Sequence, residues 1–219
     1  MDAILLSAGV GHRTGLGYPK QFLLLNGKPM IVYSLEVLRS CDEINKIIVT
    51  CNKQTIDLCQ EFIDKYHISD VECVLGGETR QDSVRMGLKR VNSSRVLIHE
   101  SARPLISVDF VKELLVVENE VAVVPTIPIK FTVLEGGEYM EKELVRKKLH
   151  NVQLPQIFDT GVLKEAHEKA AIDGYQSTED GMLVFHYGNK VRFVPGRESN
   201  IKVTTMLDVE MVNKLLKLS

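Results

Sequence analysis

The 219-residue sequence has no tryptophan, only 6% aromatic residues and a formal net charge of −2. Binding to a nucleic-acid backbone requires an excess of cationic side chains, so this balance argues against nucleic acid as a main partner. No apolar run approaches the roughly 20 residues needed to cross a bilayer, and the amino terminus lacks the pattern of a secretory signal. We therefore expect a cytoplasmic protein that binds neither nucleic acid nor membranes.

Cysteine is also scarce, with copies at positions 41, 51, 59 and 73. None of them forms a C-x-x-C pair or lies beside a histidine at metal-ligand spacing. A secreted scaffold held by disulfides would be smaller and richer in cysteine. We expect four free thiols that fill core or near-core positions as small hydrophobic side chains.

Short apolar runs rich in β-branched residues alternate with helical patterns along most of the chain. This alternation is typical of a parallel sheet covered by helices, and the length suits a complete hydrophobic core. The expected strands are residues 3–7, 46–51, 71–75, 95–99, 121–126 and 190–194. The expected helices are residues 29–38, 53–66, 80–91, 108–117, 161–171, 179–186 and 206–218. The predicted fold class is α/β.

Residues 129–149 interrupt this alternation. Two β-prone segments flank the pair Gly136-Gly137, which predicts a hairpin inserted into the α/β sheet. An isolated two-stranded hairpin is marginally stable in water, so we expect it to pack on another surface. A second copy of the chain is the favoured surface, and the chain's own domain is the alternative.

A glycine-rich loop follows the first expected strand. Glycines at the carboxyl end of a strand let backbone N–H groups approach phosphate oxygens, which predicts nucleotide binding. The loop is not a dinucleotide fingerprint, because Thr14 stands where the third glycine is needed. It is not a Walker A loop either, because no Gly-Lys-Ser/Thr is present. Arg13 and Lys20 are placed to bracket a triphosphate across the turn.

Three further segments lie at other expected strand ends, and hence at the same edge of the sheet. Residues 76–83 open a helix and offer backbone groups and a hydroxyl to a nucleobase. Glu100 offers a carboxylate that suits a hard cation such as Mg²⁺ together with phosphate oxygens. Lys202 supplies a third cation. Each segment alone is consistent with a turn or a solvated charge, but their joint placement favours a ligand site.

These motifs, taken in order, resemble a known family. They are Ala8-Gly9-x-Gly11-x-Arg13 with Pro19-Lys20-Gln21-Phe22, Gly76-Gly77-x-x-Arg80-x-x-Ser83-Val84, His99-Glu100-x-Ala102-Arg103-Pro104, Pro155-Gln156-x-Phe158 and Asn200-Ile201-Lys202-Val203-Thr204. The set is similar to the 2-C-methyl-D-erythritol 4-phosphate cytidylyltransferases and to their relatives, the ribitol-5-phosphate cytidylyltransferases. The resemblance implies one Rossmann-like nucleotidyltransferase domain over residues 1–219. It also implies a mostly parallel sheet with helices on both faces, and a β-arm at 129–149 that joins two chains into a homodimer.

The resemblance further implies a Mg²⁺-dependent transfer of CMP from CTP to a small polyol phosphate, with release of pyrophosphate. By match of motif, the catalytic cations are Arg13, Lys20 and Lys202, and the ligand of Mg²⁺ is Glu100. The nucleotide-binding residues are Ala8, Gly9, Gly11, Gly77, Glu78, Ser83 and Ser101, and the substrate-binding residues are Thr132, Arg146 and Thr178.

Departures from the family pattern gather around the acceptor and the metal. Glu100 replaces an aspartate, Phe131 replaces an aspartate before Thr132, and Glu179 replaces an aspartate after Thr178. The triphosphate loop is intact, so the sequence predicts a CTP enzyme. The favoured acceptor is 2-C-methyl-D-erythritol 4-phosphate in isoprenoid biosynthesis. The alternatives are a ribitol-5-phosphate cytidylyltransferase for surface polysaccharide or teichoic acid, and a catalytically weak nucleotide-binding regulatory module.

Overall fold

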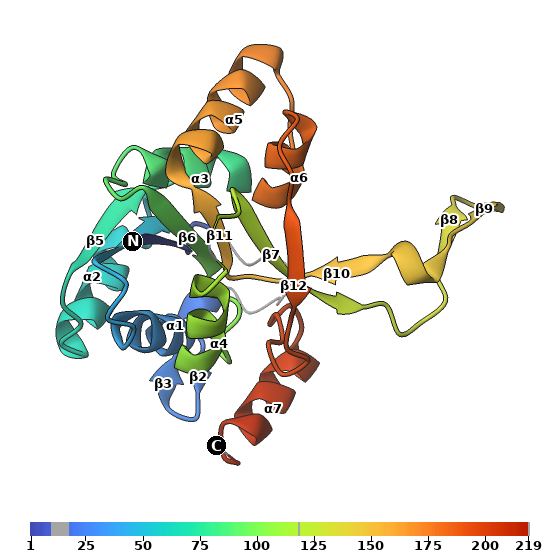
Figure 1. The fold of residues 1–219 in the computed structure, drawn as a ribbon. Helices are drawn as coiled ribbons and strands as arrows, with labels where there is room; N and C mark the ends of the chain where they lie inside the picture. The colour runs from blue at the N-terminus through green and yellow to red at the C-terminus, as the bar shows by residue number, and fades with distance from the viewer. Residues whose placement is uncertain (10–17, 118, 219) are drawn as a thin grey trace.

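The computed structural model describes residues 1–9, 18–117 and 119–218, and contains an eight-stranded sheet with helices on both faces (Figure 1). Its strands are β1 (Asp2–Leu6), β4 (Lys46–Cys51), β5 (Val71–Leu75), β6 (Arg95–Glu100), β7 (Ala122–Pro128), β10 (His150–Val152), β11 (Gln156–Asp159) and β12 (Arg192–Pro195). The strand order is β10-β7-β11-β6-β1-β4-β5, and β12 pairs with β7. The α/β prediction is confirmed.

The central strands β6, β1, β4 and β5 are parallel, whereas β11 runs antiparallel between β6 and β7. The sequence pattern did not predict β10 or β11. Both are short, with three and four residues, and Pro155 immediately before β11 removes a backbone donor that a strand would normally use. Strand β11 is nevertheless held by neighbours on both sides.

The helices are α1 (Met30–Arg39), α2 (Ile56–Lys65), α3 (Arg80–Leu88), α4 (Val108–Leu115), α5 (Thr160–Asp173), α6 (Asp180–His186) and α7 (Met206–Leu215). They confirm the seven expected helices, with ends that differ by a few residues. A two-stranded element, β2 (Leu24–Leu25) with β3 (Lys28–Pro29), precedes α1. Among the described residues, no helix has both the length and the apolar composition required to span a membrane.

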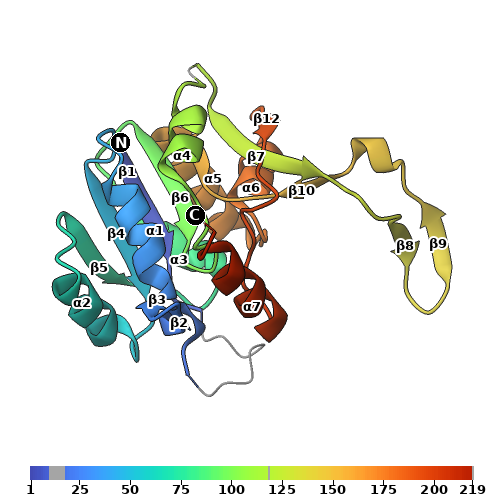
Figure 2. The same ribbon diagram turned by 90° about the horizontal axis from the view of Figure 1, so that it is seen from below.

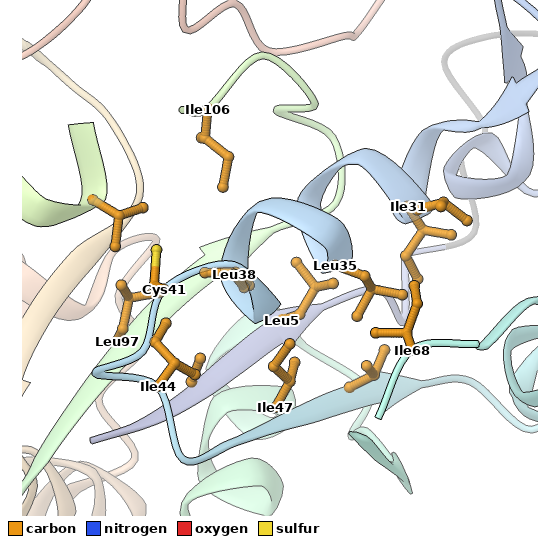
Figure 3. Close-up of a cluster of buried hydrophobic side chains, with 14 of the residues drawn as sticks. Leu5, Ile31, Leu35, Leu38, Cys41, Ile44, Ile47, Ile68, Leu97 and Ile106 are labelled. Atoms are coloured by element: carbon orange, nitrogen blue, oxygen red, sulfur yellow. The ribbon is translucent and has the colours of Figure 1, made fainter. Parts of the chain in front are cut away.

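Strand β1 is buried on both faces because apolar side chains occupy every position after the first. Ala3 and Leu5 pack in one cluster with α1, α2 and α4, and Ile4 and Leu6 pack in another with α3, α5 and α6. Figure 3 shows Leu5 of the sheet facing Leu35 of α1 in the first cluster. Burial on both faces explains why the strand reads as a continuous apolar run and not as an alternation of apolar and polar residues.

The predicted hairpin is present as β8 (Leu134–Gly136) and β9 (Met140–Glu143), an antiparallel pair with an irregularity at residues 135 and 136. A Cβ on Gly136 would lie 2.2 Å from the carbonyl oxygen of Tyr139, so the turn requires glycine there. In Figures 1 and 2 the hairpin extends away from the rest of the chain. We call residues 129–149 the arm.

The cysteines are free thiols, as expected. Cys41, Cys51 and Cys59 are buried, and Cys73 is partly buried.

Candidate active site

A cavity of about 420 Å³ opens at the carboxyl ends of β1 and β6. Open α/β sheets bind their ligands at this edge. The walls come from segments far apart in the sequence, so only folding brings them together. The lining residues are Leu6, Ser7, Ala8, Gly9, Lys20, Gln21, Gly77, Glu78, Thr79, Arg80, Ser83, Glu100, Ser101, Ala102 and Lys202. We call this space the nucleotide cavity.

The first wall is the start of the glycine-rich loop. The side-chain amide of Gln21 donates to the carbonyl of Ser7 at 2.9 Å and ties this loop to the segment that follows it. Among the described residues, no atom lies within 4 Å of a Cβ placed on Gly9, so none of them blocks the approach of a ligand to this backbone. Gly11 and Arg13, which the sequence predicts in the same site, lie outside the described residues.

The second wall is the turn between β5 and α3. The backbone N–H of Gly77 donates to Ser83 Oγ at 3.2 Å, and this hydroxyl donates to the carbonyl of Thr79 at 3.0 Å. A Cβ on Gly77 would lie 2.2 Å from the Cβ of Asp82, so only glycine fits. Thr79 caps α3 by accepting from the N–H of Asp82 at 3.0 Å. The helix therefore begins at the cavity with its positive end, which favours an anionic or oxygen-rich ligand.

The third wall carries a compact set of charges around Glu100, the last residue of β6. Arg103 Nε contacts Glu100 Oε1 at 2.9 Å, and Lys202 Nζ contacts Oε2 at 2.7 Å. Burial raises the pKa of Glu100, but the two cations outweigh this effect and hold the pKa below its ordinary value. Arg103 Nη1 also donates to the carbonyl of Asn200 at 2.8 Å. One guanidinium thus positions both the carboxylate and the segment that carries Lys202.

The two lysines reach the same cavity from opposite ends of the chain. Lys20 begins a short 3₁₀ helix (Lys20–Phe22), and its Nζ donates to the carbonyl of Val203 at 2.8 Å. The N–H of Val203 donates to the carbonyl of Ala102 at 2.8 Å, beside Ser101. These bonds fasten the carboxyl-terminal segment to the end of β6, so Lys20 and Lys202 present two positive charges to one ligand.

The whole chain, and not only its motifs, matches one protein family. The family model of 2-C-methyl-D-erythritol 4-phosphate cytidylyltransferase aligns with residues 1–217. The chain belongs to this family. It is therefore a nucleotidyltransferase, and the family predicted from the motifs is confirmed.

Relatives of the family support this assignment along the full length. The 2-C-methyl-D-erythritol 4-phosphate cytidylyltransferase of Clostridium kluyveri is 36% identical, with 98% of this chain and 96% of the relative covered. That of Alkaliphilus metalliredigens is 37% identical, with 95% and 90% covered. The crystal structure of 4-diphosphocytidyl-2C-methyl-D-erythritol synthase from Anaerococcus prevotii has a TM-score of 0.86 at 29% identity, with 99% of this chain and 97% of that chain covered. The Rossmann-like fold predicted for the cytidylyltransferase is confirmed.

Arg80 is a cavity residue to which the sequence analysis assigned no role. Its Nη2 contacts Asp180 Oδ2 at 2.8 Å and Glu179 Oε2 at 3.5 Å, and His167 Nε2 lies 3.1 Å from Asp180 Oδ1. Burial raises the pKa of Asp180, but Arg80 and His167 outweigh it and leave the pKa at about 2. The network ties α6 to α3 beside the nucleotide cavity of the cytidylyltransferase. In the sequence, this network is indicated by the acidic pair at the start of an apolar helix. A carboxylate that is buried together with such a helix needs a cationic partner.

The three predicted substrate-binding residues are not among the residues that line the nucleotide cavity. Thr132 and Arg146 are exposed on the arm, where they line a separate groove of about 510 Å³. Arg146 Nη1 donates to the carbonyl of Lys130 at 3.3 Å. Thr178 is exposed just before α6, and its hydroxyl contacts Met182 Sδ at 3.9 Å. Within one chain, these three residues therefore do not share a cavity with Lys20 and Lys202.

Proposed function

We propose that this chain transfers CMP from CTP to 2-C-methyl-D-erythritol 4-phosphate, with release of pyrophosphate, in isoprenoid biosynthesis. The observation that carries the proposal is the convergence of Lys20, Lys202 and the turn at Gly77 on one cavity in a member of this family. Two ammonium groups and a helix amino terminus form a site for a triphosphate. The relatives named above identify the acceptor that the assay should test first.

The reaction is a displacement at phosphorus. An oxygen of the acceptor phosphate forms a bond to the α-phosphorus of CTP, and the bond from that phosphorus to the bridging oxygen of the β-phosphate breaks. Pyrophosphate leaves with the electron pair of the broken bond. Since no protein group becomes covalently attached, the chain contributes alignment and neutralisation of charge. Lys20 and Lys202 supply the charge from the described residues, and Arg13 is assigned the same role by its motif.

The nucleotide contacts follow from the cavity walls. Ala8 and Gly9 are proposed to hold phosphate oxygens through backbone N–H groups, because their small side chains allow a close approach. Gly77, whose N–H donates to Ser83 Oγ, is proposed to contact the nucleotide through the rest of its turn. Glu78, Ser83 and Ser101, which also line the cavity, are proposed to contact the nucleoside, together with Gly11 of the glycine-rich loop.

Glu100 is proposed to hold Mg²⁺, and its environment fits that ion. Proteins bind Mg²⁺ through one or two carboxylates plus substrate phosphates, and Glu100 lines the same cavity as Lys20 and Lys202. Arg103 holds Oε1, so Oε2, which contacts Lys202, would be the oxygen available to the ion. When bound, Mg²⁺ would polarise the phosphoryl oxygens. Lys202 would then turn from the carboxylate to the phosphates.

The metal assignment is tested by the Mg²⁺ dependence of Glu100 variants. We expect Glu100→Gln to raise the Mg²⁺ concentration for half-maximal activity at least about tenfold, and Glu100→Asp to keep or raise activity. An unchanged Mg²⁺ requirement in Glu100→Gln, or loss of activity in Glu100→Asp, would show that the ion is held elsewhere. Glu165→Gln, on the exposed face of α5, is the control.

We also propose that the arm joins two chains and completes each site in the partner. The arm exposes large apolar side chains, which a monomer seldom does over a contiguous patch. They are Phe131, Leu134, Tyr139, Met140 and Val145. Residues of α6 and β12 line another groove, which includes the exposed Phe185 and Phe193. Strand β12 pairs with β7, the strand that leads into the arm (Figure 1). Arg146 is suited to a substrate phosphate because its guanidinium offers paired donors.

A mixed-dimer experiment decides whether Arg146 acts in the partner's site. Chains with Lys20→Met and chains with Arg146→Ala are each inactive in this scheme, and a mixture of the two is then refolded or co-expressed. If the sites are shared, about a quarter of the wild-type activity returns, because half of the dimers are mixed and each has one intact site. No recovery, or a fully active monomer in sedimentation, would contradict the proposal.

The function is tested by pyrophosphate release with CTP, Mg²⁺ and a panel of methylerythritol, ribitol, erythritol and glycerol phosphates. We expect release only with all three components and the highest kcat/KM with 2-C-methyl-D-erythritol 4-phosphate. Ribitol 5-phosphate as the best acceptor would favour the related transferase. In Lys20→Met and Lys202→Met we expect turnover to fall about 10²–10³-fold with a modest change in CTP affinity. Lys169→Met, an exposed change on α5, should retain full activity.

A cytoplasmic location is proposed on chemical grounds. All four cysteines are free thiols, which is the state maintained in a reducing compartment. Fractionation of cells against a periplasmic marker tests it, and recovery of the protein with that marker would overturn it.

A further inference from the structure

Three of the four cysteines converge outside the nucleotide cavity. Cys51 is the last residue of β4, Cys73 lies on β5 and Cys59 lies on α2. In the register of β4 with β5, Cys51 pairs with Leu75 and Cys73 pairs with Val49, so both cysteines lie on the same face of the sheet. Cys59 belongs to the apolar cluster on that face, and the three Sγ atoms lie within 4.8 Å of one another.

The spacing of the sulfurs suits a shared metal ion better than a disulfide. A zinc–thiolate bond is about 2.3 Å long, so three thiolates on one ion lie about 4 Å apart. Small side-chain movements from separations within 4.8 Å reach this arrangement. A disulfide would require two sulfurs to approach to about 2 Å, which is a larger displacement in a packed core.

The chemistry of the cluster selects a soft cation. Its three ligand atoms are all sulfur, and thiolates prefer ions such as Zn²⁺ and Cd²⁺ over Mg²⁺. Three thiolates with a divalent ion leave one net negative charge, whereas a monovalent ion would leave two in an apolar region. Cys73 is the partly exposed member of the cluster, which gives the ion access.

We propose that Cys51, Cys59 and Cys73 form a trithiolate site for a thiophilic divalent cation such as Zn²⁺ or Cd²⁺. Binding forms three metal–sulfur bonds and releases the thiol protons to solvent, with no change of oxidation state. The site would fasten α2 to β4 and β5. The carbonyl of Cys51 accepts from the N–H of Gly76 at 2.8 Å, so the site lies directly beneath the turn that lines the nucleotide cavity.

The test is a titration of reduced, chelator-treated protein with Cd²⁺ in the absence of oxygen, followed by the ultraviolet thiolate-to-cadmium absorption. We expect saturation at one ion per chain, proton release, displacement by Zn²⁺ and no competition from excess Mg²⁺. Cys59→Ser and Cys73→Ser should weaken binding at least about tenfold. Cys41→Ser is the matched control, because Cys41 is a buried thiol of the same apolar cluster and is not one of the three ligands.

A second measurement uses only the wild-type chain, so its outcome does not depend on whether the cysteine variants fold. In the wild-type chain, Zn²⁺ should slow the modification of Cys73 by a thiol reagent and raise the temperature of unfolding, whereas Mg²⁺ should do neither. No thiolate absorption with Cd²⁺, or equal binding by the wild type and Cys73→Ser, would overturn the site. Pyrophosphate release is not used as a readout, so this test is independent of the proposed function.

Discussion

Arg103 holds two parts of the nucleotide cavity together, and its replacement by methionine tests how the site is built. The guanidinium donates to Glu100 Oε1 at 2.9 Å, to the carbonyl of Asn200 at 2.8 Å and to that of Val152 at 3.5 Å. Methionine keeps much of the aliphatic packing and removes all three donors. Glu100, which is 7% exposed, then retains Lys202 as its cationic partner.

The expected loss in the free energy of unfolding follows from the burial of Glu100. Removing one partner of a buried ion pair costs about 3–5 kcal/mol, because the remaining charge stays desolvated. We expect about 3 kcal/mol in the free energy of unfolding, at the low end of that range, because Lys202 still faces Glu100. The control is Lys169→Met, which breaks a 2.7 Å pair with Glu165 whose side chains are 49% and 63% exposed. It should cost less than about 0.5 kcal/mol.

The assay is urea unfolding of both variants and the wild type at one protein concentration over a range of pH. The pKa of Glu100 is lowered on folding, so its ion pairs stabilise the chain above the ordinary value of 4.5 and this contribution is lost as the pH falls through the lowered pKa. The difference between wild type and Arg103→Met should therefore be constant near neutral pH and shrink in acid. A loss below about 1 kcal/mol at pH 7, or a difference that grows in acid, would show that Arg103 does not form a stabilising ion pair with Glu100.

Three further outcomes are expected. Gly77→Ala should raise the KM for CTP about tenfold or more, because the added Cβ would lie 2.2 Å from that of Asp82. Gly137→Ala should leave the KM unchanged, because its Cβ would have no described atom within 4 Å. Steady-state kinetics compares the two variants. Asp180→Asn should destabilise the chain by about 3 kcal/mol or more, since Arg80 loses its buried partner. That loss, measured by urea unfolding, should persist from neutral pH to about pH 4 and vanish toward the Asp180 pKa of about 2; a pH-independent loss would contradict it. Removal of divalent ions with EDTA should abolish pyrophosphate release and added Mg²⁺ should restore it, as measured in the same assay.

The central strands and the helices could be predicted from the sequence because their causes are local. The apolar run of β1 buries both faces of a strand wherever it is placed, and Thr205 with Asp208 forms the capping box of α7. Gly77 is required by a close approach to Asp82 within its own turn, so the cause is again local. These features depend on residues a few positions apart.

The contacts between residues that are distant in the sequence could be seen only in the tertiary structure. Arg103 joins Glu100 to the segment of Lys202 because β6 and the carboxyl-terminal segment lie side by side, which no sequence spacing encodes. The cysteine spacing argued against a metal site, yet Cys51, Cys59 and Cys73 come from two strands and a helix that pack on one another. Local patterns follow from backbone geometry and burial of neighbouring residues, whereas sites like these depend on long-range packing, which brings side chains together whatever their separation along the chain.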